Sequence, residues 1–158
     1  MKRFLKLSFI LLLITTFGCS GDSANCTTPP PSFVFEFIDK NSDENLFANG
    51  AFDAKQPITV IDLDTNKIIQ NETLNKDNLY CLIINSIGWQ TAVYNYSINI
   101  KGKSVFELHV SAERVSEDHC NFSRIKSIEI KNAEFKLDKT TGIYKILFTE
   151  YLNKKELP

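Results

Sequence analysis

The sequence predicts an all-β protein: an antiparallel β-sandwich of immunoglobulin-like or transthyretin-like kind, with about seven to nine short strands. Three observations favour this fold. Short runs of β-branched and aromatic residues recur along the chain, several of these runs alternate with a period of two, and no amphipathic helical pattern exceeds two turns. A small barrel is the alternative arrangement of the same strands.

The first half of the domain supplies four of the predicted strands. Residues 33–38 place three phenylalanines on one face, and residues 57–63 form a second strand. A turn at 64–67 allows a short strand over 67–70 to pair back. Residues 79–85 are mostly apolar, as expected for a central strand that is covered on both faces.

The second half contains the clearest predicted hairpin of the chain. Residues 91–100 and 103–110 alternate on either side of a Lys101–Gly102 turn. Residues 124–131 also alternate, with a phase slip that predicts a β-bulge. Two further strands, over 133–137 and 143–148, complete the domain. A turn over 138–142 lies between them.

Residues 1–18 have the pattern of a secretory signal peptide. Lys2, Arg3 and Lys6 form a positive start, an apolar run follows over 9–14, and small Gly18 precedes Cys19. The apolar run is too short for a stable membrane-spanning helix. We therefore expect this segment to be removed on export.

The end of this leader resembles the lipobox of bacterial lipoproteins, through residues 16–19 (Thr-Phe-Gly-Cys). Thr16 departs from that pattern, which usually has Leu there. The resemblance implies that Cys19 becomes the first residue and carries lipid, which would hold the protein in the cell envelope, on the periplasmic or surface face of the outer membrane. Several acyl chains, at about 0.8 kcal/mol per buried CH₂, would anchor it firmly.

The domain boundaries follow from the leader and from composition. Residues 19–32 are small, polar and then proline-rich, and predict the lipidated cysteine with a flexible tether. The β-sandwich domain is expected over 33–152, and a frayed polar tail over 153–158. Removing the leader takes three of the 18 basic residues and none of the 19 acidic ones, leaving a net charge of −4. This charge argues against nucleic acid as a partner.

Three cysteines remain once Cys19 is assigned to lipid. Cys26 and Cys120 lie in polar, loop-like surroundings, and we expect a disulfide between them because the cell envelope permits disulfides. A Cys81–Cys120 bridge is the alternative. Cys81 lies in an apolar run, where a buried free thiol would pack as a small hydrophobe.

Trp89 lies between two predicted strands and has two interpretations. A tryptophan in this position commonly fills the core or anchors a loop. The functional interpretation is a surface aromatic residue that contacts a ligand, such as a sugar ring. The usual burial of tryptophan favours the first interpretation.

The candidate catalytic and metal-binding patterns are incomplete. The acidic turns beginning at Asp39 and Asp62 lack the glycine and glutamate that complete an EF-hand loop. Residues 117–120 (Glu-Asp-His-Cys) are adjacent, so their side chains cannot all converge on zinc. His109 is expected to face outward with Glu107. Nucleophile-elbow and phosphate-loop motifs are also lacking, so the sequence predicts no catalytic residues, no metal and no cofactor.

Two segments of the domain, 35–47 and 120–128, resemble small cell-envelope lipoproteins of Bacteroidetes, which combine a lipobox leader with a β-sandwich domain of unknown function. The resemblance implies no catalytic residue. We therefore expect a non-enzymatic binding or accessory module that displays loops to an envelope protein or glycan. One alternative is a small metal-dependent or hydrolytic enzyme using loop carboxylates with His109 or His119. Another is an inhibitor of a secreted enzyme.

Overall fold

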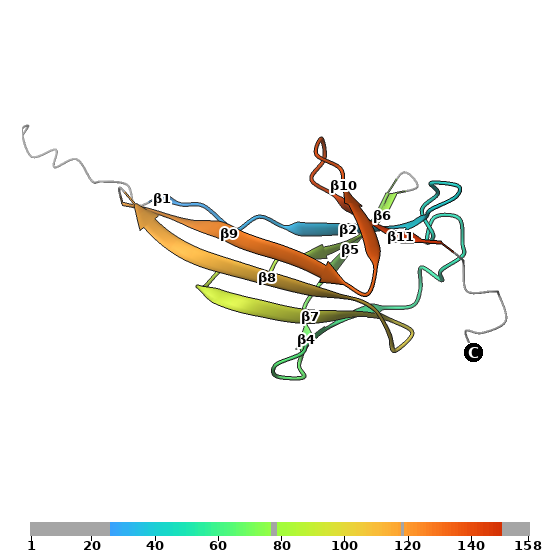
Figure 1. The fold of residues 1–158 in the computed structure, drawn as a ribbon, viewed down its shortest axis with the longest axis horizontal. Coiled ribbons are helices and arrows are strands. Elements are labelled where there is room, and N and C mark those ends of the chain that lie inside the picture. The colour runs from blue at the N-terminus through green and yellow to red at the C-terminus, as the bar shows by residue number, and fades with distance from the viewer. Residues whose placement is uncertain (1–25, 77–78, 118, 150–158) are drawn as a thin grey trace, which may run out of the picture.

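The computed structural model describes residues 26–76, 79–117 and 119–149, and within them the chain forms two packed β-sheets without a helix (Figure 1). Cys19, the leader and the tail over 153–158 lie outside the described residues. The six-stranded sheet has the order β1 (Cys26–Thr27), β9 (Cys120–Lys131), β8 (Lys103–Glu117), β7 (Ala92–Ile100), β3 (Ile58–Asp62), β4 (Ile68–Ile69). The five-stranded sheet has the order β10 (Glu134–Leu137), β11 (Tyr144–Phe148), β2 (Phe33–Asp39), β6 (Leu79–Ile84), β5 (Glu72–Lys76).

The prediction of an all-β sandwich is confirmed. Three of its details are wrong: the purely antiparallel pairing, the number of strands and the expectation that every strand is short. Both sheets are mixed, because β1 pairs with β9 and β11 pairs with β2 in parallel. The described chain contains eleven strands, and two of them are long, with 15 residues in β8 and 12 in β9. The direction in which β11 meets β2 depends on how the chain crosses between sheets, and residue alternation does not encode that crossing.

Several local predictions are confirmed by the strand pairing. The β7–β8 hairpin turns at Lys101 and Gly102, which both have positive φ, at 54° and 74°. The predicted bulge is present in β9, because Ser111 pairs with Ser127 whereas Ala112 pairs with Ile125. The short return strand β4 pairs with β3, and β6 is flanked by β2 and β5, as expected for a strand inside a sheet.

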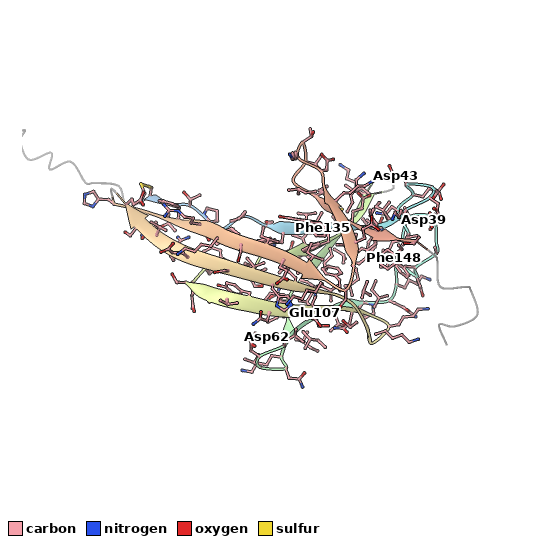
Figure 2. All side chains as sticks on the ribbon, viewed as in Figure 1. Asp39, Asp43, Asp62, Glu107, Phe135 and Phe148 are labelled. Atoms are coloured by element: carbon pink, nitrogen blue, oxygen red, sulfur yellow. A yellow bond between two sulfur atoms is a disulfide. The ribbon has the colours of Figure 1, made fainter. Side chains whose placement is uncertain are left out.

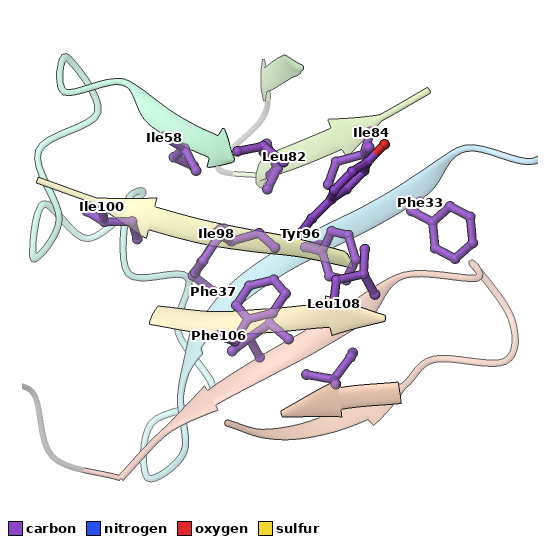
Figure 3. Packing of buried hydrophobic residues seen from close by; sticks show 14 of the residues in the cluster. Phe33, Phe37, Ile58, Leu82, Ile84, Tyr96, Ile98, Ile100, Phe106 and Leu108 are labelled. Carbon is purple, nitrogen blue, oxygen red and sulfur yellow. The ribbon is translucent and has the colours of Figure 1, made fainter. Parts of the chain in front are cut away.

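Aromatic and branched side chains between the sheets form the core (Figure 3). The predicted phenylalanine face of β2, at Phe33, Phe35 and Phe37, is buried. The ring of Phe106 from β8 lies 5.2 Å from Phe35 and 6.3 Å from Phe37 between centroids, which joins the two sheets. Fully burying such a side chain contributes about 1.5–3 kcal/mol, so this cluster is a main source of stability.

The distal half of the β8–β9 hairpin continues past the five-stranded sheet (Figure 1). We call residues 112–117 and 120–125 the arm. β1 runs beside its outer strand, and a disulfide joins Cys26 to Cys120. The predicted Cys26–Cys120 bridge is therefore confirmed, and the Cys81–Cys120 alternative is wrong. The first described strand begins at Cys26, within the segment that composition assigns to the tether.

Candidate functional site

The loop over 85–91 connects β6 with β7 and holds Trp89. Its shape depends on Gly88, which has a φ of 92°, in the region that favours glycine. A Cβ atom at Gly88 would collide with Ser123 Oγ in the arm and would lie 3.0 Å from Pro30 Cβ. The glycine therefore allows the loop to pack closely against β9 and against the segment that follows β1.

Trp89 is exposed on this loop, with 53% of its surface accessible. The interpretation of Trp89 as a core residue is thus wrong. The indole Nε1–H donates a hydrogen bond to the carbonyl oxygen of Asn85 at 2.9 Å, which restrains the ring. Ligand contact by Trp89 remains a prediction, and the exposed, restrained ring is compatible with it.

A hollow of about 240 Å³ lies beside Asn85, the residue that accepts the Trp89 hydrogen bond. We call it the Asn85 hollow. Residues from the β4–β5 connection, β5, β6 and the 85–91 loop line it: Gln70, Asn71, Glu72, Ile83, Asn85 and Ser86. Five of these six residues are polar, and Glu72 is the one charged residue among them.

Hydrogen bonds hold part of this lining in place. Asn85 Nδ2 donates to Glu72 Oε1 at 3.2 Å, which joins the loop to the edge strand β5. Asn71 Nδ2 lies 3.3 Å from the carbonyl oxygen of Ile69 and 3.4 Å from that of Ile58. The Ser86 hydroxyl is 3.4 Å from the Tyr96 hydroxyl. Restrained polar groups around a concave surface can orient a small ligand.

The sequence singles out Trp89 but not the residues that line the hollow. Gln70, Asn71 and Glu72 precede or begin β5, whereas Asn85 and Ser86 follow β6. These two groups meet only because β5 and β6 pair antiparallel, with Glu72 opposite Ile83. Their polar character looks like that of an ordinary loop in the sequence, so no local signal marks them.

His109 faces outward with Glu107, as predicted. Its Nε2 lies 3.2 Å from Glu107 Oε2, and its Nδ1 lies 2.7 Å from Asn95 Oδ1. Asn95 Nδ2 in turn donates to Asp64 Oδ2 at 3.0 Å. The histidine thus lies within a hydrogen-bonded row on the outer face of the six-stranded sheet.

The structure does not bring the two histidines together. His119 is exposed at the end of the arm, and the rest of β8, roughly 25 Å of extended chain, separates it from His109. Within the described residues, no group of three or more His, Cys, Asp or Glu side chains is placed to hold a metal ion.

The acidic turns use their carboxylates to stabilise the turns themselves. Asp39 Oδ1 accepts hydrogen bonds from the backbone N–H groups of Asn41 and Ser42, and Asp62 Oδ1 does the same for Asp64 and Thr65. The Ser42 and Asn41 bonds hold the pKa of Asp39 below its ordinary value. Figure 2 shows Asp39 and Asp43 at the end of the molecule opposite the disulfide.

Cys81 is buried in β6, as expected for a structural thiol. Burial raises the pKa of this thiol to about 11, with a further contribution from the negative charge of Glu36. Because the thiolate is the reactive form, burial and the raised pKa lower the reactivity of Cys81 in the folded protein.

Comparison with protein-family models, with curated proteins and with solved structures finds no match to this chain. In the described part of the chain, no helix is long and apolar enough to cross a membrane.

Proposed function

We propose that this chain is a non-enzymatic lipoprotein of the cell envelope, anchored through lipid on Cys19, that binds a protein or glycan partner. The leader over 1–18 and the Cys19 position support the anchor. The resemblance to small Bacteroidetes lipoproteins supports the same localisation. The domain then serves as a binding or accessory module.

One observation carries the binding role: Trp89 is exposed on a loop whose conformation is fixed by other contacts. Its indole is hydrogen-bonded to Asn85, and Gly88 packs the loop against the arm. Large exposed aromatic rings are enriched at binding sites, because they bury much area at little conformational entropy cost. The arm and the Cys26–Cys120 disulfide therefore support the loop that we assign to binding.

Mass spectrometry of the mature protein tests the anchor. The expected N-terminus is Cys19 with a mass increase equal to the attached lipid. The Cys19→Ser variant should leave the membrane fraction, whereas Cys81→Ser should remain there as a matched control. An unlipidated N-terminus at another residue would contradict the anchor.

The fluorescence of Trp89 tests the binding role, because it is the single tryptophan of the chain. Protein and polysaccharide fractions of the source envelope are titrated separately against the full chain. The fractions are matched for absorbance, and the emission of tryptophan in the protein fraction is subtracted with a Trp89→Phe blank. Alternatively, Trp89 itself is replaced by 5-fluorotryptophan and is followed by ¹⁹F resonance. A partner should shift the Trp89 emission to the blue and protect it from acrylamide quenching.

Loss of binding in Trp89→Ala, measured by retention of the variant on the immobilised fraction, would support the assignment of the loop. Phe135→Ala is the matched control, since Phe135 is an exposed aromatic residue on β10 of the five-stranded sheet. Unchanged emission with every fraction would refute the binding role of the loop.

A further inference from the structure

We infer that the Asn85 hollow binds a neutral sugar residue, and that Trp89 packs against an adjoining ring of the same glycan. This inference rests on the proposed binding function and names the chemical class of the ligand. It depends on three properties of the site: the restrained aromatic face, the polar lining of the hollow and the sign of its charge.

The indole offers an apolar surface that suits a sugar. One face of a pyranose ring carries axial C–H groups, and an aromatic face packs against such groups while the hydroxyls remain in water. The hydrogen bond from Trp89 Nε1 to the Asn85 carbonyl oxygen, at 2.9 Å, fixes one edge of the indole. Binding therefore immobilises little additional side-chain freedom, which lowers its entropic cost.

The lining of the hollow matches the hydrogen-bonding groups of a sugar. Asn71 Nδ2 already donates to the carbonyl oxygens of Ile58 and Ile69, so the Asn71 side chain offers its Oδ1 as an acceptor. The amides of Gln70 and Asn85 and the hydroxyl of Ser86 can both donate and accept. Sugar hydroxyls likewise do both. Most of the surface that these residues expose in the hollow is apolar, and Ile83 is the one apolar residue among them. A concave site that combines apolar surface with a few placed polar groups is typical of small-ligand recognition.

The charge of the hollow selects between classes of sugar. Glu72 is the charged residue of the lining, and Lys, Arg and His do not occur among the lining residues. Its carboxylate can accept hydrogen bonds from neutral hydroxyls, but it repels the carboxylate of a uronic or sialic acid. A neutral sugar is therefore favoured.

The size and position of the hollow suggest how much of a glycan it holds. Its volume of about 240 Å³ is below the range of roughly 300–1,000 Å³ that is typical of sites for drug-sized ligands. It suits one ring. Because Trp89 bonds to a residue of the lining but does not itself line the hollow, a second ring would extend from the hollow across the indole.

The test measures Trp89 emission of the full chain in a detergent that contains no sugar. The probes are neutral disaccharides, each paired with the corresponding uronic acid. Neutral disaccharides should shift the emission to the blue and reduce acrylamide quenching, with saturation in the micromolar to millimolar range. Each uronic acid should bind at least tenfold more weakly than its neutral partner.

Four variants separate the contributions, with binding measured by calorimetry. Trp89→Ala should weaken neutral disaccharide binding at least tenfold, whereas Trp89→Phe should retain part of it. Glu72→Gln should reduce the ratio between neutral and acidic affinities, because it removes the repulsion but keeps the side-chain shape. Phe135→Ala should bind as the unaltered chain does.

The possible failures of this inference and of the proposed function can be distinguished. Emission that responds to an envelope protein fraction but to no sugar would overturn the sugar assignment and leave the binding function intact. Tighter binding of the acidic sugars would also overturn it. Absence of a response to every sugar and every envelope fraction would overturn both.

Discussion

The two halves of the β8–β9 hairpin are stabilised by different physical interactions. In the half that lies over the five-stranded sheet, Phe106, Leu108 and Val110 are fully buried between the sheets. The arm has no second sheet along much of its length (Figure 1). A disulfide, hydrogen bonds and close packing against the 85–91 loop hold it instead.

Arg114 illustrates how the arm is held. Its guanidinium donates to the carbonyl oxygen of Thr28 at 3.1 Å and to that of Asn121 at 3.3 Å. Its backbone N–H donates to Thr91 Oγ1 at 2.8 Å. One residue thus connects β8, β9, the segment after β1 and the last residue of the 85–91 loop. A sandwich can therefore extend one hairpin beyond its core if specific contacts replace hydrophobic burial.

The largest expected effect is in the buried half. Phe106→Ala removes a ring that contacts Phe35 and Phe37, so the free energy of unfolding should fall by about 3–5 kcal/mol. Urea unfolding of the full chain measures this change. Arg114→Ala in the arm serves for comparison, and should cost about 1–2 kcal/mol because hydrogen bonds contribute less. Equal losses for the two variants would show that the halves do not differ.

The second prediction concerns the disulfide of the arm. Replacing Cys26 and Cys120 by serine should lower the free energy of unfolding by about 2–5 kcal/mol, because the bridge closes a long chain segment with a sequence separation of 94. Hydrogen exchange should accelerate most in 112–125 and least around Phe106. Uniform acceleration along β8 and β9 would argue that the arm has no separate stability.

The third prediction tests the packing of the loop against the arm. Gly88→Ala combines a positive φ with a collision at Ser123, and should destabilise the protein by about 1–3 kcal/mol. Gly102→Ala is the matched control, because it has a φ of 74° and no atom within 4 Å of the added Cβ. The excess loss at Gly88, measured by urea unfolding, reports the contact with Ser123. Identical losses would rule that contact out as a constraint.

The fourth prediction concerns pH and the buried thiol. The pKa of Cys81 rises from 9.0 to about 11 on folding, so the neutral thiol favours the folded state. This contribution is fully present below pH 9 and should be lost between pH 9 and about 11. The free energy of unfolding is measured across this pH range for the parent chain and for Cys81→Ala. The difference between the two isolates the contribution of the Cys81 thiol. A difference that does not change with pH would contradict the burial of this group.

The strands and turns are largely predictable because their signals are local. Alternation at 91–100 and 103–110, with Lys101 and Gly102 between them, is sufficient to predict the β7–β8 hairpin. The phase slip in 124–131 predicts the bulge for the same reason, since a bulge reverses the alternation at one residue. The exposure of Trp89 is not predictable in this way, because it depends on how its loop packs against Ser123 and Pro30.

The order of residues along the chain is enough to establish that the domain is built of β-strands and where most of them lie. It also predicts an export signal at the start, with Cys19 as the expected lipid site. Each of these depends on residues that are close together along the chain. The parallel pairs, the reach of the arm and the meeting of Glu72 with Asn85 beside Trp89 emerge only in the tertiary structure. Those features depend on long-range contacts, whose energies arise only when distant segments are brought together by the packing of the two sheets.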